Sequence, residues 1–373
     1  MARDLKELAI TANGLKFENP FVIGSGPPST NRATIAKAFR DGWGGVVAKT
    51  ISLEGSAVKN VAPRYGKLYA RESREVIGFQ NIELISDRPL KDWLKDFEAV
   101  KKEYPGKILI ASLMEACDKA AWQKLTRLVC QTGVDALELN FSCPHGMPEK
   151  KMGSAMGQCP EVVKEVTHWV KEVSSVPVWA KMTPNITDIS IPSLEAVAGG
   201  ADGISLINTI LAVIGIDLKT LRPLPTVEGY SIPGGYSGQA IRPIALRHVL
   251  DLARALKTTK QEHITMSGIG GVECGKDALE FILMGCHTVQ SCTAPMLQGF
   301  GMVKEMITTT QNFMQEHGFN SIEQFRGRSL PFFTTHAHLV ELKQGKFEKG
   351  QVARDTEWSG DEIAKQTKNM TNN

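Results

Sequence analysis

Eight short apolar runs alternate with eight amphipathic segments along the 373 residues of the chain. The apolar runs are rich in β-branched residues and do not alternate with polar ones, which is typical of parallel strands covered on both faces. Eight strand–helix units predict an α/β fold, a (β/α)8 TIM barrel. A doubly wound open sheet is the alternative, but the Gly-x-Gly-x-x-Gly signature is missing after the first strand.

The periodicity gives bounds for each unit. We expect strands at Phe21–Ser25, Gly45–Thr50, Ile108–Met114, Ala136–Ser142, Val178–Met182, Gly203–Asn208, Ile264–Ser267 and Thr288–Cys292. We expect helices at Arg32–Asp41, Lys91–Glu103, Ala120–Thr132, Glu161–Ser174, Ile191–Ala198, Pro243–Leu256, Gly275–Met284 and Met302–His317.

Two insertions exceed the minimal barrel, Ser52–Pro89 and Leu211–Ala240. Such insertions usually build the mouth of a barrel's active site. From His336 onward the chain turns polar and charged. We therefore expect residues 1–335 to form the barrel and residues 336–373 to form a polar C-terminal extension, packed on the outside or frayed.

Composition excludes several classes of protein. The content of 42% hydrophobic and 22% charged residues is typical of a globular protein, and a net charge of +3 argues against a nucleic-acid partner. No apolar run is long enough to span a membrane, and residues 1–6 carry no secretory or organelle signal. The seven cysteines form no Cys-x-x-Cys pair. We therefore expect no metal site and no iron–sulfur cluster, and a reducing compartment.

Polar side chains collect where the fourth strand ends. Asn140, Ser142, Cys143 and His145 follow one another there, and the loop Met147–Gln158 comes next. This loop is longer than a usual βα connection, so we expect a lid. A lone cysteine is most often a small buried hydrophobe, but this one lies at the polar end of a strand, where a barrel has its active site. His145 is most simply a loop residue that orients its neighbours.

Other strand ends carry cations and glycines. Lys49 and Lys181 end apolar strands, and a buried lysine needs an anionic partner or a functional role. The glycines of Gly268–Gly271, with Cys292 and Thr293 after the next strand, lie where barrels bind phosphate. Two lysines and a phosphate site favour an anionic, electron-accepting cofactor over a metal. A Schiff base on a lysine is the alternative.

Side chains able to read a planar ligand are also present. Asn81, Asn140, Asn208 and Thr209 supply paired donors and acceptors, which suit a pyrimidine with its alternating C=O and N–H groups. For Asn81 a role in a turn is an equal alternative.

Nine stretches together carry a family resemblance. They are Asn19-Pro-Phe21, residues 42–50, Asn81-Ile-Glu-Leu-Ile85, residues 140–146, Ala180-Lys-Met-Thr-Pro-Asn185, Ile207-Asn-Thr209, Gly235-Tyr-Ser-Gly238, residues 241–246 and residues 267–272. In combination they resemble the dihydropyrimidine dehydrogenases, in particular their FMN-binding, dihydroorotate-dehydrogenase-like barrel. Residues 229–237 and 326–335 look most like the single-domain plant enzymes, which reside in plastids.

The resemblance implies a reaction and a set of site residues. The reaction would be NADPH-dependent reduction of uracil or thymine through FMN, with Cys143 as the general acid on the lid and Lys181 beside N1 of the flavin. FMN would be held by Ser25, Lys49, Thr50, Lys181, Gly238, Gly270, Gly271, Cys292 and Thr293. The pyrimidine would be held by Asn81, Asn140, Phe141, Ser142, Asn208 and Thr209.

The route of the electrons is where the chain departs from the family. Animal members carry extra flavin, iron–sulfur and NADPH domains, and bacterial members use a partner subunit. Here NADPH either reduces FMN directly at the same mouth, where Arg64, Arg71, Arg74 and Arg222 could grip its phosphates, or a separate reductase is needed.

Three other functions stay open from the sequence alone. They are dihydroorotate oxidation, which needs a cation for the substrate's carboxylate, a flavin subunit that depends on an electron-transfer partner, and a Schiff-base lyase that uses Lys181. We expect a homo-oligomer, a dimer. The location would be the plastid if the chain is plant-like with its transit peptide removed, and otherwise the cytoplasm.

Overall fold

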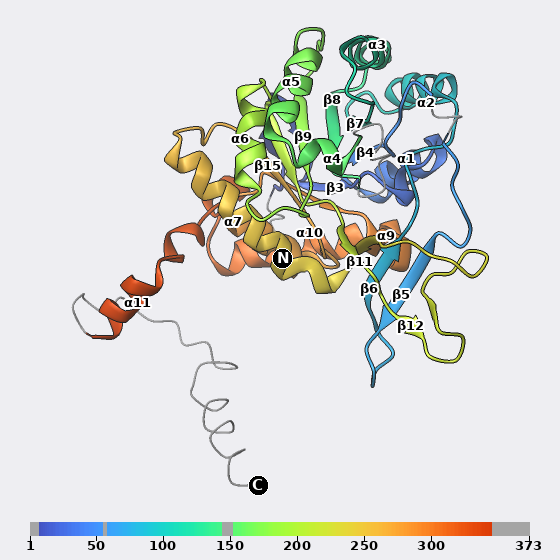
Figure 1. Ribbon diagram of the computed structural model, residues 1–373. Helices are drawn as coiled ribbons and strands as arrows, with labels where there is room; N and C mark the ends of the chain where they lie inside the picture. Colours follow the sequence, from blue (N-terminus) through green and yellow to red (C-terminus); the bar gives the residue numbers. More distant parts are fainter. Residues whose placement is uncertain (1–6, 55–57, 144–151, 345–373) are drawn as a thin grey trace. The chain divides into compact units, whose positions relative to one another are not determined.

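The computed structural model describes residues 7–54, 58–143 and 152–344. Their central element is a closed barrel in which every strand pairs in parallel with its neighbours (Figure 1). Around the barrel the strands are β3 (Phe21–Ile23), β4 (Gly45–Val47), β7 (Ile108–Leu113), β8 (Ala136–Phe141), β9 (Val178–Met182), β10 (Gly203–Leu206), β15 (Thr265–Ile269) and β16 (Thr288–Ser291). The expected (β/α)8 barrel is confirmed.

Among the described residues, eight helices surround the strands, as expected. They are α1 (Arg32–Asp41), α2 (Leu90–Glu103), α3 (Lys119–Cys130), α5 (Pro160–Lys171), α6 (Ser190–Ala198), α7 (Arg242–Thr258), α8 (Gly275–Leu283) and α10 (Val303–Glu316). The ends of these elements differ from the expected bounds by at most three residues. The helix–strand layer is filled by large side chains such as Trp93, Phe97 and Trp122, which are fully buried.

Local sequence signals fix the helix ends. The side chain of Asn31 accepts a hydrogen bond from the N–H of Thr34 and caps α1, which ends at Gly42 with φ 110°. Asp118 caps α3 in the same way through the N–H of Ala121. Such caps satisfy N–H groups that have no partner inside the helix.

A hairpin not expected from the sequence closes the N-terminal end of the barrel. Strands β1 (Ile10–Ala12) and β2 (Leu15–Phe17) turn through Asn13 and Gly14, both with positive φ. The side-chain oxygen of Asn13 accepts hydrogen bonds from Nε1 of Trp179 and Oγ1 of Thr265, each 2.7 Å long. The runs are too short to have been distinguished from loop by periodicity.

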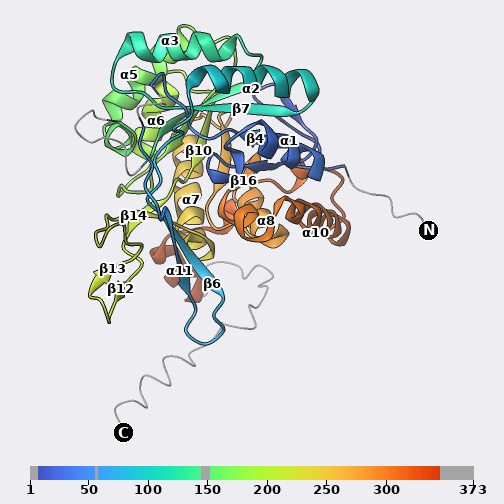
Figure 2. The ribbon, with the colours of Figure 1, turned by 90° about the vertical axis from the view of Figure 1, so that its right-hand side faces the viewer.

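The two insertions form one antiparallel sheet. Its order is β11-β14-β6-β5, with β5 (Tyr65–Tyr69) and β6 (Val76–Asn81) from the first insertion and β11 (Ile210–Ala212) and β14 (Gly234–Ser237) from the second. Figure 2 shows β6, β12, β13 and β14 on the same side of the barrel. Strands β12 (Ile216–Asp217) and β13 (Arg222–Pro223) form a separate small hairpin.

The remaining elements are short. They are α4 (Ser154–Gly157), α9 (Thr293–Gln298) and the 3-10 helices η1 (Pro27–Ser29), η4 (Gln239–Ile241), η5 (Phe300–Met302), η6 (Ile322–Gln324) and η7 (Leu330–Phe332). The chain divides into two compact units after Leu330. In the second unit, α11 (His336–Lys343) is capped by Thr335. Within the described residues, no helix combines the length and apolar character needed to cross a membrane.

Candidate active site

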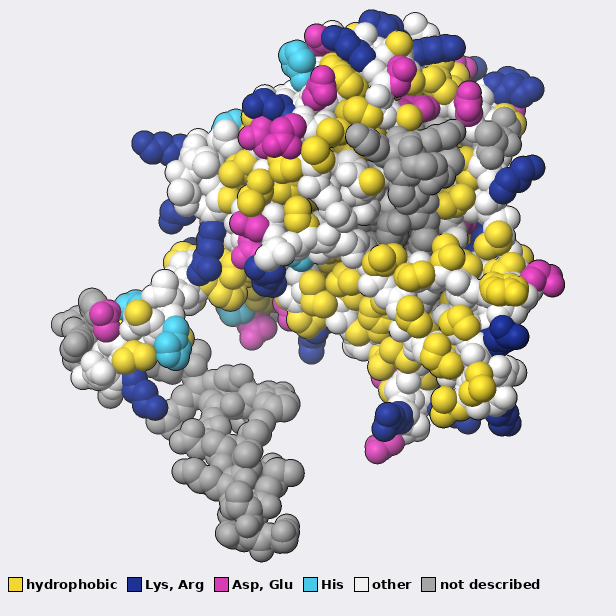
Figure 3. Space-filling view, viewed as in Figure 1, with side chains coloured by type: hydrophobic (Ala, Val, Ile, Leu, Met, Phe, Trp, Pro, Cys, Tyr) yellow, Lys and Arg dark blue, Asp and Glu magenta, His cyan; other side chains and the backbone are white. Residues whose placement is uncertain are grey.

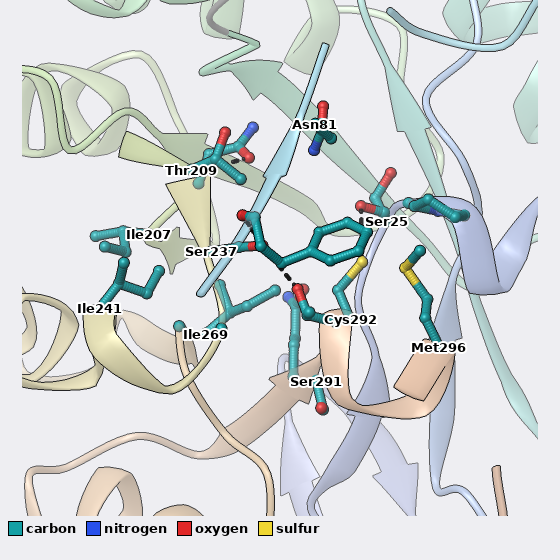
Figure 4. A pocket seen from close by; sticks show the side chains of 18 of the residues that line it. Ser25, Asn81, Ile207, Thr209, Ser237, Ile241, Ile269, Ser291, Cys292 and Met296 are labelled. Carbon is teal, nitrogen blue, oxygen red and sulfur yellow. Dashed lines mark hydrogen bonds between the residues drawn. The ribbon is translucent and has the colours of Figure 1, made fainter. Parts of the chain in front are cut away.

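A pocket opens at the carboxyl ends of the barrel strands. It has a volume of about 960 Å³, including the space open to solvent at its mouth. Figure 4 shows Asn81 and Thr209 on one side of it and Ser291 and Cys292 on another. The sequence-predicted residues that line the pocket are Ser25, Lys49, Thr50, Asn81, Asn140, Cys143, Lys181, Asn208, Thr209, Gly238, Gly270, Gly271, Cys292 and Thr293.

Two predicted residues do not line the pocket. Successive side chains of a strand point to opposite faces, so on β8 Asn140 points into the barrel and Phe141 points out. The ring of Phe141 is fully buried and lies 6.3 Å from that of Trp122 in α3. Ser142 lies behind the pocket wall, where its hydroxyl donates to Oδ1 of Asn140 and accepts from Nδ2 of Asn208.

Hydrogen bonds join the polar strand ends into one network. Nδ2 of Asn140 donates to Oγ1 of Thr50 at 2.9 Å, and this hydroxyl also lies 2.8 Å from that of Ser112 and 3.2 Å from that of Ser25. Because the Nδ2 of Asn140 donates to Thr50 while its Oδ1 accepts from the N–H and the hydroxyl of Ser142, the amide of Asn140 is held in one orientation. The network gives the pocket wall fixed donors and acceptors.

A buried carboxylate of the first insertion pairs with two cations. Glu83 is 7% exposed, and its two oxygens contact Nζ of Lys49 at 2.6 Å and Nη1 of Arg64 at 2.8 Å. Arg64 also lies 3.6 Å from Asp87. Sequence reasoning missed Glu83. Its spacing of two from Asn81, which places both on one face of an extended segment, was the available signal.

A second ion pair lies deeper in the barrel. Nζ of Lys181 lies 3.6 Å from Oε1 of Glu138, and both side chains are buried. The other oxygen of Glu138 accepts from Nε2 of Gln290 at 3.0 Å. Lys181 therefore has the anionic partner that a buried lysine requires, in addition to lining the pocket.

Glycines bring three loops close together at the opposite wall. Gly270 and Gly271 have φ of 139° and 70°, and Gly238 has φ of 93°. A Cβ on Gly271 would lie 2.9 Å from the carbonyl oxygen of Gly238 and 2.9 Å from the backbone nitrogen of Arg242. The hydroxyls of Ser237 and Thr293 lie 2.8 Å apart across this wall. Sequence reasoning missed Ser237, although its neighbour Gly238 was included.

Two cysteines line the pocket in different surroundings. Burial raises the pKa of the Cys292 thiol to about 11, against the opposing effect of the positive charges of Lys181 and Lys49. Cys143 is buried in a small apolar cluster with Ile85, Met114 and Met152. The thiol of Cys292 is therefore neutral near pH 7, and Cys143 lies where the end of β8 meets the first insertion.

The expected lid is described only in part. Residues 144–151, which include His145, lie outside the described residues. Beyond them the chain returns to β8, where the N–H of Ser154 donates to the carbonyl of Cys143 at 3.0 Å. A Cβ on Gly153 would lie 2.6 Å from that carbonyl, so this return needs a glycine.

The four arginines expected to grip NADPH are not gathered together. Arg64 is engaged by Glu83, and none of the four lines the pocket. Arg71 and Arg74 are exposed in the turn between β5 and β6, and Arg222 is exposed on β13. In the described part of the chain, no group of three or more His, Cys, Asp and Glu residues could hold a metal ion.

The arrangement fits a flavin mononucleotide. A glycine-lined wall lets backbone N–H groups approach a phosphate closely, and polar strand ends with Lys49 and Lys181 line the rest of the pocket. A parallel (β/α)8 barrel with such a site defines the class of flavin-binding barrels.

The family comparison identifies the chain more closely. The family model described as dihydroorotate dehydrogenase matches residues 7–314, and the chain belongs to this family, which is one of FMN flavoenzymes. The chain is 54% identical over 376 residues to "Dihydropyrimidine dehydrogenase (NADP(+)), chloroplastic" of Arabidopsis thaliana, covering 98% of this chain and 88% of the relative.

Two further relatives are more distant. The chain is 42% identical over 324 residues to "NAD-dependent dihydropyrimidine dehydrogenase subunit PreA" of Escherichia coli K12, covering 86% of this chain and 76% of the relative. It is 35% identical over 325 residues to "Dihydroorotate dehydrogenase B (NAD(+)), catalytic subunit" of Pyrococcus abyssi, covering 87% of this chain and 99% of the relative.

Proposed function

We propose that this protein reduces uracil or thymine to the 5,6-dihydropyrimidine, with FMN as cofactor and NADPH as the ultimate electron donor. The observation that carries this choice is the neutral character of the amide-lined side of the pocket. Dihydroorotate carries a carboxylate and needs a cation with spare charge. Here Glu83 pairs with Lys49 and Arg64, and Asp87 also pairs with Arg64, so two carboxylates balance these two cations and leave no spare positive charge.

The pocket residues divide between cofactor and substrate. Ser25, Lys49, Thr50, Lys181, Gly238, Gly270, Gly271, Cys292 and Thr293 would hold FMN, with the glycines around its phosphate. Asn81, Asn140, Asn208 and Thr209 would bind the pyrimidine, and Ser142 would hold both amides in place. We leave Phe141 out of this set, because its side chain packs against Trp122.

Two residues act on the charges and protons of the reaction. When bound, FMN supplies the hydride that adds to C6 of the pyrimidine ring. The thiol of Cys143 delivers a proton to C5, as a positioned general acid. The ammonium group of Lys181, which lines the pocket, would stabilise the negative charge that the flavin gains on reduction, because a fixed positive charge costs no reorganisation.

Spectroscopy and product analysis test the proposal. The purified protein should show the absorption of bound flavin, which should bleach with NADPH under anaerobic conditions and return when uracil is added. Mass spectrometry should find dihydrouracil. Turnover of dihydroorotate without turnover of pyrimidines would overturn the proposal in favour of dihydroorotate oxidation. A colourless protein would favour a Schiff-base lyase that uses Lys181.

The source of electrons forms a second part of the proposal. We propose that NADPH reduces the flavin directly, alternating with the pyrimidine at one mouth, and that no iron–sulfur cluster takes part. Support comes from the cysteine spacing and from the Arabidopsis relative, whose name includes NADP(+). The Escherichia coli relative is named as a subunit, which favours the alternative of a separate reductase partner.

Stopped-flow mixing separates these two routes. Anaerobic addition of NADPH alone to the pure chain should reduce the flavin on the time scale of turnover, and excess uracil should inhibit the step. A flavin that stays oxidised for minutes would exclude the direct route and leave the reductase partner.

Oligomeric state and location complete the proposal. We propose a homodimer, because the second insertion exposes large apolar side chains, among them Leu218, Leu221 and Tyr230. Figure 3 shows apolar side chains gathered in the region of this insertion. Light scattering should give twice the chain mass.

We also propose a plastid location from the name of the Arabidopsis relative, to be tested by imaging a fluorescent fusion of the natural precursor.

A further inference from the structure

A carboxylate lies below the floor of the pocket without lining it. Glu138 on β8 has 0% exposure, and its partner Lys181 on the neighbouring strand β9 has 3%. In the strand register Lys181 pairs with Asn140, two residues nearer the mouth than Glu138. The lysine therefore faces the pocket, and the carboxylate lies one layer beneath it.

The surroundings of Glu138 are otherwise neutral. Its second oxygen accepts from Gln290, whose Nε2 also lies within hydrogen-bonding distance of the hydroxyls of Ser267 and Ser205. Lys181 is the only charged partner recorded for Glu138 among the residues that the structure describes. A buried carboxylate costs several kcal/mol to desolvate, and breaking a buried pair leaves the other charge uncompensated. Each charge of this pair is thus stabilised by the other, and removing one would leave the other uncompensated.

We propose that Glu138 is a positioning residue that sets the electron affinity of the flavin through Lys181. Its carboxylate holds the ammonium group at the pocket floor, and its negative charge partly offsets the positive charge that the flavin experiences. The inference rests on the proposed binding of FMN in this pocket. It assigns the control of the flavin's electron affinity to the pair of Glu138 and Lys181 rather than to the lysine alone.

The sign of the effect follows from charge. Reduction adds negative charge to the flavin, so a nearby anion opposes it and a nearby cation favours it. Glu138→Gln should make the flavin easier to reduce, and Lys181→Met should make it harder. The double variant should lie between the two single variants. In a buried site we expect each single change to alter the ratio of the dissociation constants of oxidised and reduced FMN by about tenfold or more.

The test is the midpoint potential of FMN bound to the purified protein, measured anaerobically against reference dyes at one pH. A positive shift in Glu138→Gln is the expected result. Ser205→Ala is the matched control, because it removes a hydroxyl contact of the same Gln290 without changing charge, and its potential should equal that of the wild type. Glu138→Asp keeps the charge and should restore most of the wild-type value.

Three outcomes would overturn the proposal: a wild-type potential in Glu138→Gln, a negative shift in that variant, or an equal shift in Ser205→Ala. If Glu138→Gln does not fold, the comparison of Lys181→Met with the double variant measures the same carboxylate, because replacing both charges of a buried pair is often tolerated. The measurement needs bound flavin but no pyrimidine. A flavoprotein inactive on uracil would therefore refute the proposed reaction and leave this inference testable.

Discussion

Asn208 joins the substrate side of the pocket to the strand that carries Asn140. Its Nδ2 donates to Oγ of Ser142 at 2.8 Å, and its Oδ1 accepts from the N–H of Thr209. Asn208→Ala should weaken uracil binding by about 1–3 kcal/mol, the usual cost of leaving a buried polar partner unmet. Titration calorimetry with uracil and the flavin content of the variant provide the check. Loss of flavin with uracil affinity retained would mean that Asn208 belongs to the cofactor site.

Cys143 supports a second prediction at the residue scale. Cys143→Ala should reduce turnover by roughly 10²–10⁴-fold, the usual contribution of a positioned acid. Flavin content should be unchanged, because the thiol is expected to act on the substrate. Cys159→Ala is the control, since Cys159 lies outside the pocket and contacts Glu161. Turnover close to the wild type in Cys143→Ala would remove this thiol from the reaction.

The pocket residues at the ends of the barrel strands were the easiest to predict from the sequence. A polar residue at the end of an apolar run predicts a place at the mouth of a barrel, and Lys49, Asn140 and Lys181 all line the pocket. The contact expected from Phe141 ignored the alternation of side chains along β8. Glu83 was missed because its segment belongs to an insertion in which no strand had been expected.

At the scale of elements, the sheet over the mouth depends on a glycine that leaves room for an aromatic ring. A methyl group on Gly78 of β6 would collide with the ring of Tyr236 on β14. Gly78→Ala should destabilise this sheet by about 1–3 kcal/mol, the cost of overpacking, and should expose it to proteolysis. Gly215→Ala in the second insertion is the control, because nothing lies within 4 Å of a Cβ there. Equal protease resistance in both variants would contradict the expected clash.

The loop after β15 gives the second prediction at this scale. Gly271→Ala should abolish FMN binding, because its φ of 70° disfavours a side chain and the new Cβ would crowd Gly238 and Arg242. Gly318→Ala has the same φ of 70° with nothing within 4 Å, so it should cost backbone strain and leave FMN bound. Flavin absorbance per protein chain is the measurement. Equal flavin content in both variants would show that the loop does not form the cofactor wall.

The barrel elements could be predicted where periodicity was sustained. Apolar runs and amphipathic segments gave every barrel strand and its helix. The strands of the insertions could not be found in the same way, because β14 is a four-residue segment with two glycines and its partner β6 lies far away in the sequence. Such pairing depends on tertiary contacts, which a local pattern does not encode.

At the scale of the whole molecule, the first compact unit holds every described residue that lines the pocket. Its lining residues all precede Leu330, after which the second unit begins. A chain ending at Leu330 should therefore bind FMN and melt close to the full-length protein. A chain ending at Asn320 should be destabilised by several kcal/mol, because it lacks Ile322 and Phe325, which are 1% and 0% exposed. Calorimetry of both truncations is the test, and equal melting temperatures would contradict the assignment of these two residues to the core.

The pairing of β16 with β3 has a consequence for synthesis of the protein. The last barrel strand to leave the ribosome closes against the first, and Cys292 and Thr293 follow it directly. The wall that contains Cys292 and Thr293 therefore cannot form before β16 has been synthesised. In the same way, β6 cannot pair with β14 until the second insertion has been synthesised. Contacts between segments distant in sequence form slowly, because the chain loses entropy before they reward it. Until β16 has been made, the strands that precede it form a sheet with an open edge, and an exposed edge of this kind is prone to aggregation during synthesis.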